Sequence, residues 1–153
     1  MKKFSILLGI TTMITSCYAL QIINVKEYIN KAQSQLTEES LKLQEKLDAR
    51  LPVSSQATVG KVESQKISLT SFTQSVFIIG DDAVSRLWLK DNTARLEAAN
   101  AMGFVANITE SQHLQTLQQL TKAPLLPANV DDLMSIFKES HYPLAFIKGK
   151  LWQ

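Results

Sequence analysis

Cysteine, glycine and proline are scarce in this chain. Its 153 residues include one cysteine, five glycines and four prolines. One cysteine cannot form an internal disulfide or a Cys-x-x-Cys redox pair, and with only two histidines beside it a zinc site lacks ligands. No Walker loop, Gly-x-Gly-x-x-Gly or Gly-x-Ser-x-Gly motif is present, so nothing indicates a bound nucleotide, another cofactor or a serine hydrolase.

An excess of charge of one sign is also missing. The chain carries 16 basic and 14 acidic residues. It has no basic block with interleaved aromatic residues, which argues against direct nucleic-acid binding. With 45% hydrophobic and 20% charged residues, the composition is that of a globular protein with room for one domain and an extension.

The one long apolar run stands at the N-terminus. Lys2 and Lys3 precede the run 4–14, and small or polar residues 15–19 follow it. This order is typical of a secretory signal peptide over residues 1–19, because a membrane span needs about 20 apolar residues. We therefore expect an exported, periplasmic protein, with an uncleaved anchor as the alternative.

Two processing routes fit this segment. Cys17 and Ala19 have the small side chains that signal peptidase needs before a cut at Leu20. Alternatively, the stretch 14–17 resembles a bacterial lipobox, in which Cys17 becomes a lipidated first residue that tethers the protein to a membrane. Both routes stay open at this point.

A helical extension is expected over residues 20–50. Apolar residues recur at helical spacing across 25–49, with Glu and Lys between them. A second piece could start at Thr37, so a break there is an alternative. Leu51-Pro52 ends the helix, because the residue before a proline avoids the α region. We expect a loosely packed spacer helix, with a partner-binding helix as the alternative.

A linker is predicted over residues 51–75, which are rich in Ser, Thr, Gln and Gly. Val59, Val62 and Ile67 are its candidates for a short edge strand.

From residue 76 to 153, predicted strands and helices alternate. Short apolar runs predict strands at 76–79, 102–108, 124–127, 144–147 and 151–153. Helices are predicted from Asp82 to about Asn100, over 112–121 after a cap at 109–112, and after a cap at 129–132. This order predicts an α/β protein: a thioredoxin-like sandwich, with a central sheet, flanking helices and a closing β-hairpin, preceded by the N-terminal helix.

Inward-facing positions follow from this assignment. In the first helix of this domain we expect a buried face made of Val84, Leu87, Trp88, Leu96 and Ala99. Trp152, at the C-terminus, is expected to be exposed and available to a partner.

The turn at residues 80–85 is the main candidate for a working surface. It follows a buried strand and opens a helix, the place where open α/β sheets bind ligands and where a thioredoxin-like oxidoreductase holds its Cys-x-x-Cys. Asp82 is predicted to cap the helix. A Tyr-Pro bond has a raised chance of being cis, and in thioredoxin-like folds the corresponding bond is cis and faces this turn, so Tyr142 would lie opposite residues 81–85. A proline that starts a strand, with Tyr142 packed on the helix, is the alternative. The predicted partner-binding residues are Gly80, Asp81, Asp82, Ser85, His141, Tyr142 and Pro143.

Other uses of these side chains are less well supported. Asp81 and Asp82 are adjacent carboxylates, but Ca²⁺ and Mg²⁺ need more oxygen ligands, and the pair is better explained by capping. An exported enzyme or metal-dependent protein using Asp81, Asp82 and His141 remains the alternative. A thiol-handling chaperone that acts through Pro143 without its own cysteine is a third hypothesis. His113 is expected on a helix surface and Trp88 in the core.

A series of short motifs resembles a family of exported proteins encoded in integrating conjugative elements with a type IV secretion system of the genomic-island type. The matching residues are Leu51-Pro-Val53, Gly60-Lys-Val62, Phe77–Asp82, Ser85–Leu89, Ala101–Val105 with Asn107, Leu126-Pro127, Asp131–Leu133 and His141–Leu144. The architecture is also similar to TrbC-like conjugation proteins, which are thioredoxin-like and involved in pilus assembly.

The resemblance implies an accessory role in conjugative DNA transfer and supplies no catalytic residues. The expected function is therefore that of a non-catalytic module that binds other envelope proteins of the apparatus, with no cofactor, no metal and no direct contact to DNA.

Overall fold

The computed structural model describes residues 14–68 and 72–153, with side chains from Ile29 onward. Within these residues it contains four helices and eight strands. The chain divides into a unit that ends at Gln44 and a second unit, Glu45–Gln153.

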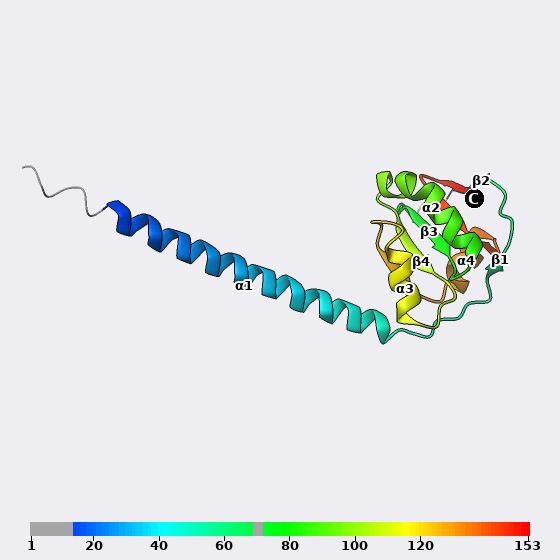
Figure 1. Cartoon of the computed structure of the whole chain (residues 1–153). Coiled ribbons are helices and arrows are strands. Elements are labelled where there is room, and N and C mark those ends of the chain that lie inside the picture. Colours follow the sequence, from blue (N-terminus) through cyan, green and yellow to red (C-terminus); the bar gives the residue numbers. More distant parts are fainter. Residues whose placement is uncertain (1–13, 69–71) are drawn as a thin grey trace, which may run out of the picture. The chain divides into compact units, whose positions relative to one another are not determined.

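Helix α1 runs without interruption over Ile14–Asp48 (Figure 1). The break considered at Thr37 is wrong, because α1 continues through it; the Thr37 hydroxyl donates back to Gln33 O at 2.9 Å within the helix instead of capping a second one. The helix ends before Leu51-Pro52, as predicted. It begins inside the interval interpreted as a signal peptide, and residues 1–13 of that interval lie outside the described part.

Six strands form one mixed sheet in the second unit. Its order is β2-β8-β7-β3-β4-β5. β3, β4 and β5 are parallel, while β7 runs antiparallel to both β3 and β8. The strands are β2 Gln65–Lys66, β3 Val76–Ile79, β4 Met102–Val105, β5 Leu125–Pro127, β7 Leu144–Ile147 and β8 Lys150–Trp152. The predicted α/β class and the positions of β3, β5, β7 and β8 are thus confirmed. β4 starts as predicted but ends at Val105, three residues before the predicted end of the strand.

Three helices cover this sheet: α2 Ala83–Ala98, α3 Ser111–Gln118 and α4 Asp131–Phe137 (Figure 1). Successive residues of a strand point to opposite faces. Phe77 accordingly packs in one buried cluster with residues of α2 and α3, whereas Ile78 packs in the other with residues of α4. The fold is therefore a sheet between two apolar layers.

The buried face of α2 differs from the predicted one. Val84 and Leu87 are 52% and 63% exposed, while Trp88 and Leu96 are buried as predicted. Ser85 faces inward with them, and this rotates the helix so that positions 84 and 87 point outward. Ala99 is the C-cap residue and is half-buried.

Trp152 is buried, contrary to the prediction, with 5% of its surface exposed. Its ring lies 5.6 Å from that of Trp88. The guanidinium of Arg95 covers it, 3.7 Å from the ring centre. A cation over an aromatic face is attracted by the ring quadrupole, so the C-terminal strand is held down on α2.

The interval 51–75 is more structured than a linker with one edge strand. β1, Thr58–Val59, pairs in parallel with β6, His141–Tyr142, and β2 pairs with β8. Val62 lies outside both strands and is buried. The described part of this interval thus belongs to the folded unit.

The helix caps predicted from the sequence are confirmed for some of the helices and not for others. Asp82 is the N-cap of α2. α3 starts one residue earlier than predicted, and its N-cap, Glu110, makes no side-chain capping bond. α4 has Val130 at its N-cap, but Asn129 Oδ1 accepts from Asp131 N at 2.9 Å and so supplies the capping oxygen from the predicted stretch.

Candidate functional site

The central contact of the site is between the ring of Tyr142 and Gly80. A side-chain Cβ built at Gly80 would come within 2.5 Å of the Tyr142 ring. Only a residue without a side chain leaves room for this contact. Tyr142 is buried, and its hydroxyl accepts from Asn107 Nδ2 at 3.3 Å. The predicted meeting of Tyr142 with the 80–85 turn is confirmed, and the Tyr142-Pro143 bond is cis.

Asp82 and Ser85 close the first turn of α2. Asp82 Oδ1 accepts from Ser85 N at 2.8 Å, and Ser85 Oγ donates to Asp82 Oδ2 at 2.7 Å. Ser85 Oγ also accepts from Gly80 N at 2.9 Å. Because Ser85 is fully buried and its hydroxyl both donates and accepts within the turn, its role here is to hold the turn against α2.

The side chain of Asp81 contacts both α2 and α3. Its carboxylate pairs with Arg86 of α2, and its Oδ2 lies 2.6 Å from His113 Nδ1 of α3. The second contact has the distance of an ion pair without the alignment of a hydrogen bond. His113 is 44% exposed at its side chain, while Asp81 is only 13% exposed. His113 is thus on the helix surface, as predicted, but it belongs to this cluster.

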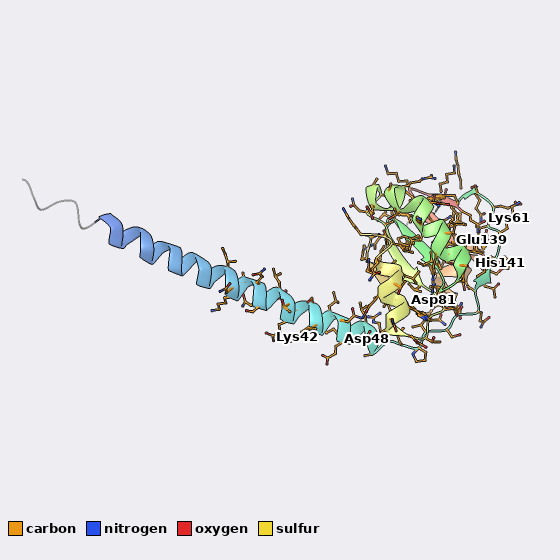
Figure 2. All side chains as sticks on the ribbon, viewed as in Figure 1. Lys42, Asp48, Lys61, Asp81, Glu139 and His141 are labelled. Carbon is orange, nitrogen blue, oxygen red and sulfur yellow. The ribbon has the colours of Figure 1, made fainter. Side chains whose placement is uncertain are left out.

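His141 lies apart from the Asp81 cluster. Its Nδ1 is 3.1 Å from Thr58 Oγ1, and its ring packs against Gly60, where an added Cβ would come within 2.5 Å. Figure 2 labels His141 and Asp81 at separate places on the sheet domain. Asp81, Asp82 and His141 therefore have different partners.

Asn107, like His113 and Arg86, belongs to this site although the sequence analysis did not assign it there. It follows β4. Its Oδ1 accepts from Ser55 N at 2.8 Å, and its Nδ2 donates to Ala57 O at 2.9 Å. The signal available in the sequence was an amide near the carboxyl end of an apolar strand, the edge of the sheet where open α/β folds generally bind ligands.

The segment held by Asn107, residues 53–60, is named the strap. Val53 forms an isolated antiparallel bridge with Ile108. Thr58 N donates to Ser140 O, and Gly60 N donates to Tyr142 O, both at 3.0 Å. The strap therefore crosses the residues that follow β4 and runs along β6. The chain itself fills this part of the sheet edge.

Among the residues described by the structure, no group of three or more His, Cys, Asp or Glu side chains is placed to hold a metal ion. No helix within the same residues is both long and apolar enough to cross a membrane. Cys17 falls in α1, in the part where only the backbone is described.

The comparisons give a family and no closer relative. No curated protein matches the chain, and no solved structure does. Residues 11–149 match the family described as a protein of unknown function, DUF2859. This match spans both α1 and the sheet domain, and the chain therefore belongs to the DUF2859 family.

Proposed function

We propose that this protein is a non-catalytic, exported assembly module of a conjugative type IV secretion apparatus encoded by an integrating conjugative element. The observation that carries the proposal is that the polar side chains at the site form hydrogen bonds within the protein. Asp82 and Ser85 form hydrogen bonds within the turn. Asn107 forms hydrogen bonds to the strap and to Tyr142.

The same elements also carry exposed apolar side chains, Val84 and Leu87 on α2 and Val59 on β1, beside exposed polar ones such as Lys90 and Thr58. Val84 and Leu87 stand three residues apart and so lie on one side of α2, where a protein partner can reach them.

The motif residues support the same proposal. Those that carry the resemblance to the conjugation family include Gly60, Gly80, Asp82, Asn107 and Tyr142. In the fold they lie in one place, joined through the Gly80–Tyr142 contact and the bonds of Asn107. Weak motifs whose residues contact one another in the fold support a resemblance to the conjugation family more strongly than the same motifs do separately.

A thioredoxin-like arrangement is part of the proposal. The order β3-α2-β4-α3, followed by β5, α4 and a hairpin β7-β8 that begins after Pro143, agrees with it. So does the position of Tyr142 against the turn that opens α2. In this layout Asp82 and Ser85 occupy the spacing of a Cys-x-x-Cys pair, with a hydrogen bond of 2.7 Å in place of the thiols.

Capture from crosslinked donor cells tests the function. The partners expected are other envelope proteins of the apparatus, recovered with the wild-type protein and lost with Leu87→Glu. Lys90→Glu is the control, because Lys90 is an exposed, charged residue of the same helix that points about 120° away from Val84 and about 60° away from Leu87 around the helix. Recovery of no secretion component, or equal recovery with both variants, would count against the proposal.

An enzyme that uses Asp81, Asp82 and His141 has less support, because the three side chains bind different partners. Asp82→Ala separates the two ideas. An assembly module loses about 0.5–2 kcal/mol of stability with the cap and keeps its partners, whereas an enzyme would lose its activity in transfer outright.

A further inference from the structure

The six-stranded sheet ends at β5 on one side and at β2 on the other, and the β5 edge is closed to a further strand. Pro124 O and Ala128 N bond to β4. Leu125 and Pro127 alternate with them and therefore face away from β4. Leu125 already donates its N–H to Gln118 Oε1 at 3.1 Å, and proline has no N–H. A strand laid beside β5 would find no backbone donor at these two positions.

The β2 edge differs, because it presents backbone groups outward. Ile67 N donates to Gly149 O at 2.9 Å beside the ladder with β8. Residue pairs of an antiparallel ladder alternate between those that exchange hydrogen bonds and those that do not. Lys66, which pairs with Lys150, is therefore of the second kind, and its N–H and C=O point away from β8. These are the groups with which a sheet edge accepts a further strand.

Three exposed lysines surround this edge. Lys66 and Lys150 lie directly opposite each other on neighbouring strands, and Lys148 stands in the turn between β7 and β8. Like charges directly opposite each other destabilise a sheet. Between residues that the structure describes, no ion pair includes any of the three. Acidic side chains laid along β2 would relieve this repulsion.

The other face of the same edge is apolar. Successive side chains of a strand point to opposite faces, so Ile67 lies on the face away from Lys66. A hollow of about 500 Å³ opens there, and its lining includes Ile67, Phe72 and Phe146. All three pack in the apolar cluster on the α4 side of the sheet. The edge thus combines basic side chains on one face with an apolar hollow on the other.

We propose that β2 accepts an extended segment of a partner protein as a further strand, and that acidic and apolar residues alternate along this segment. Its backbone pairs with Lys66. Its acidic side chains lie on the face of Lys66 and Lys150, and its apolar side chains lie on the face of the hollow. The β2 strand of a second copy does not fit, because it would bring lysines against lysines. The inference uses no residue of the site around Gly80 and does not depend on a role in conjugation.

An NMR titration of the full chain, recovered from expressing cells after its natural processing, tests the proposal. The probe is a short blocked peptide in which glutamate and valine alternate, and the control peptide has the same residues in two blocks. The alternating peptide is expected to shift the amide signals of β2 and β8 and to slow the hydrogen exchange of Lys66 N–H. Equal effects of the two peptides, or no slowing at Lys66, would overturn the proposal. So would binding of phosphatidylglycerol vesicles without binding of the alternating peptide, since the lysines would then serve a membrane surface.

Charge reversal at the edge examines the predicted chemistry of the partner. Lys66→Glu combined with Lys150→Glu is expected to weaken binding of the glutamate peptide about tenfold. The same double variant should gain binding of a peptide in which lysine and valine alternate. The control is Lys31→Glu combined with Lys90→Glu, which changes the net charge equally at exposed lysines of α1 and α2 and should keep the wild-type preference. Equal weakening in the two double variants, or no gain of the lysine peptide, contradicts the proposed pairing.

Discussion

At the residue scale, the contact between Gly80 and Tyr142 shows how strongly one position can constrain the site. The thioredoxin-like order of elements predicted that Tyr142 faces the turn, because the corresponding proline in that fold lies opposite the start of the first helix. The sequence could not predict that Gly80 is required by the ring, since that depends on a contact between residues 62 positions apart.

Gly80→Ala is expected to destabilise the protein by about 1–3 kcal/mol, the typical cost of overpacking. Urea unfolding measures the change. Tyr142→Ala removes the ring that an added methyl would strike, so the double variant should lose less stability than the two single variants summed. Additive losses would show that the methyl group strains something other than Tyr142.

Glu97 gives the molecule a defined response to acid. Its carboxylate accepts from Lys122 N at 2.6 Å, and from the hydroxyls of Thr93 at 3.1 Å and Thr121 at 3.2 Å. These bonds, first of all the one from Lys122 N, hold the pKa of Glu97 below its ordinary 4.5. A lower pKa in the folded state means that Glu97 stabilises the fold fully above about pH 4.5 and loses this effect as the pH falls through the folded value.

Urea unfolding between neutral and acid pH measures this effect. Wild type is expected to lose stability more steeply below pH about 4.5 than Glu97→Ala does. Equal acid sensitivity in the two proteins would contradict the role of Glu97.

At the element scale, the elements that the sequence predicted are those with local signals. β3 and β7 are short apolar runs bounded by turn residues, and α2 follows a capping aspartate. The strap gave no such signal. Its strand β1 has two residues, too few for an alternating pattern, and its partner β6 lies 83 residues later, as the pairing of Thr58 with His141 shows.

Asn107→Ala tests how the strap is held. The variant loses the bonds to Ser55 N, Ala57 O and Tyr142, and we expect faster amide hydrogen exchange over the strap and about 1–3 kcal/mol less stability. Asn92→Ala is the control, because Asn92 Nδ2 binds only Trp88 O within its own helix. Unchanged exchange in the strap would mean that its backbone pairs with Ile108 and β6 suffice.

At the scale of the whole molecule, export is the first property to test. The chain is expected in the periplasmic or membrane fraction, shortened at its N-terminus. Mass spectrometry identifies the first residue, and labelling with a radioactive fatty acid, compared with Cys17→Ser, separates the two routes. Label lost in Cys17→Ser indicates a lipoprotein, and an unlabelled chain that begins at Leu20 indicates ordinary cleavage. A full-length protein in the cytoplasm would contradict the predicted signal peptide.

The frequency of conjugative transfer tests the proposed function most directly. A donor strain that lacks this gene, mated with a recipient, is predicted to transfer its element far less often than wild type. The intact gene should restore transfer, and the Leu87→Glu gene should not, although its product folds. Normal transfer from the deletion strain would contradict an assembly role in the conjugation apparatus.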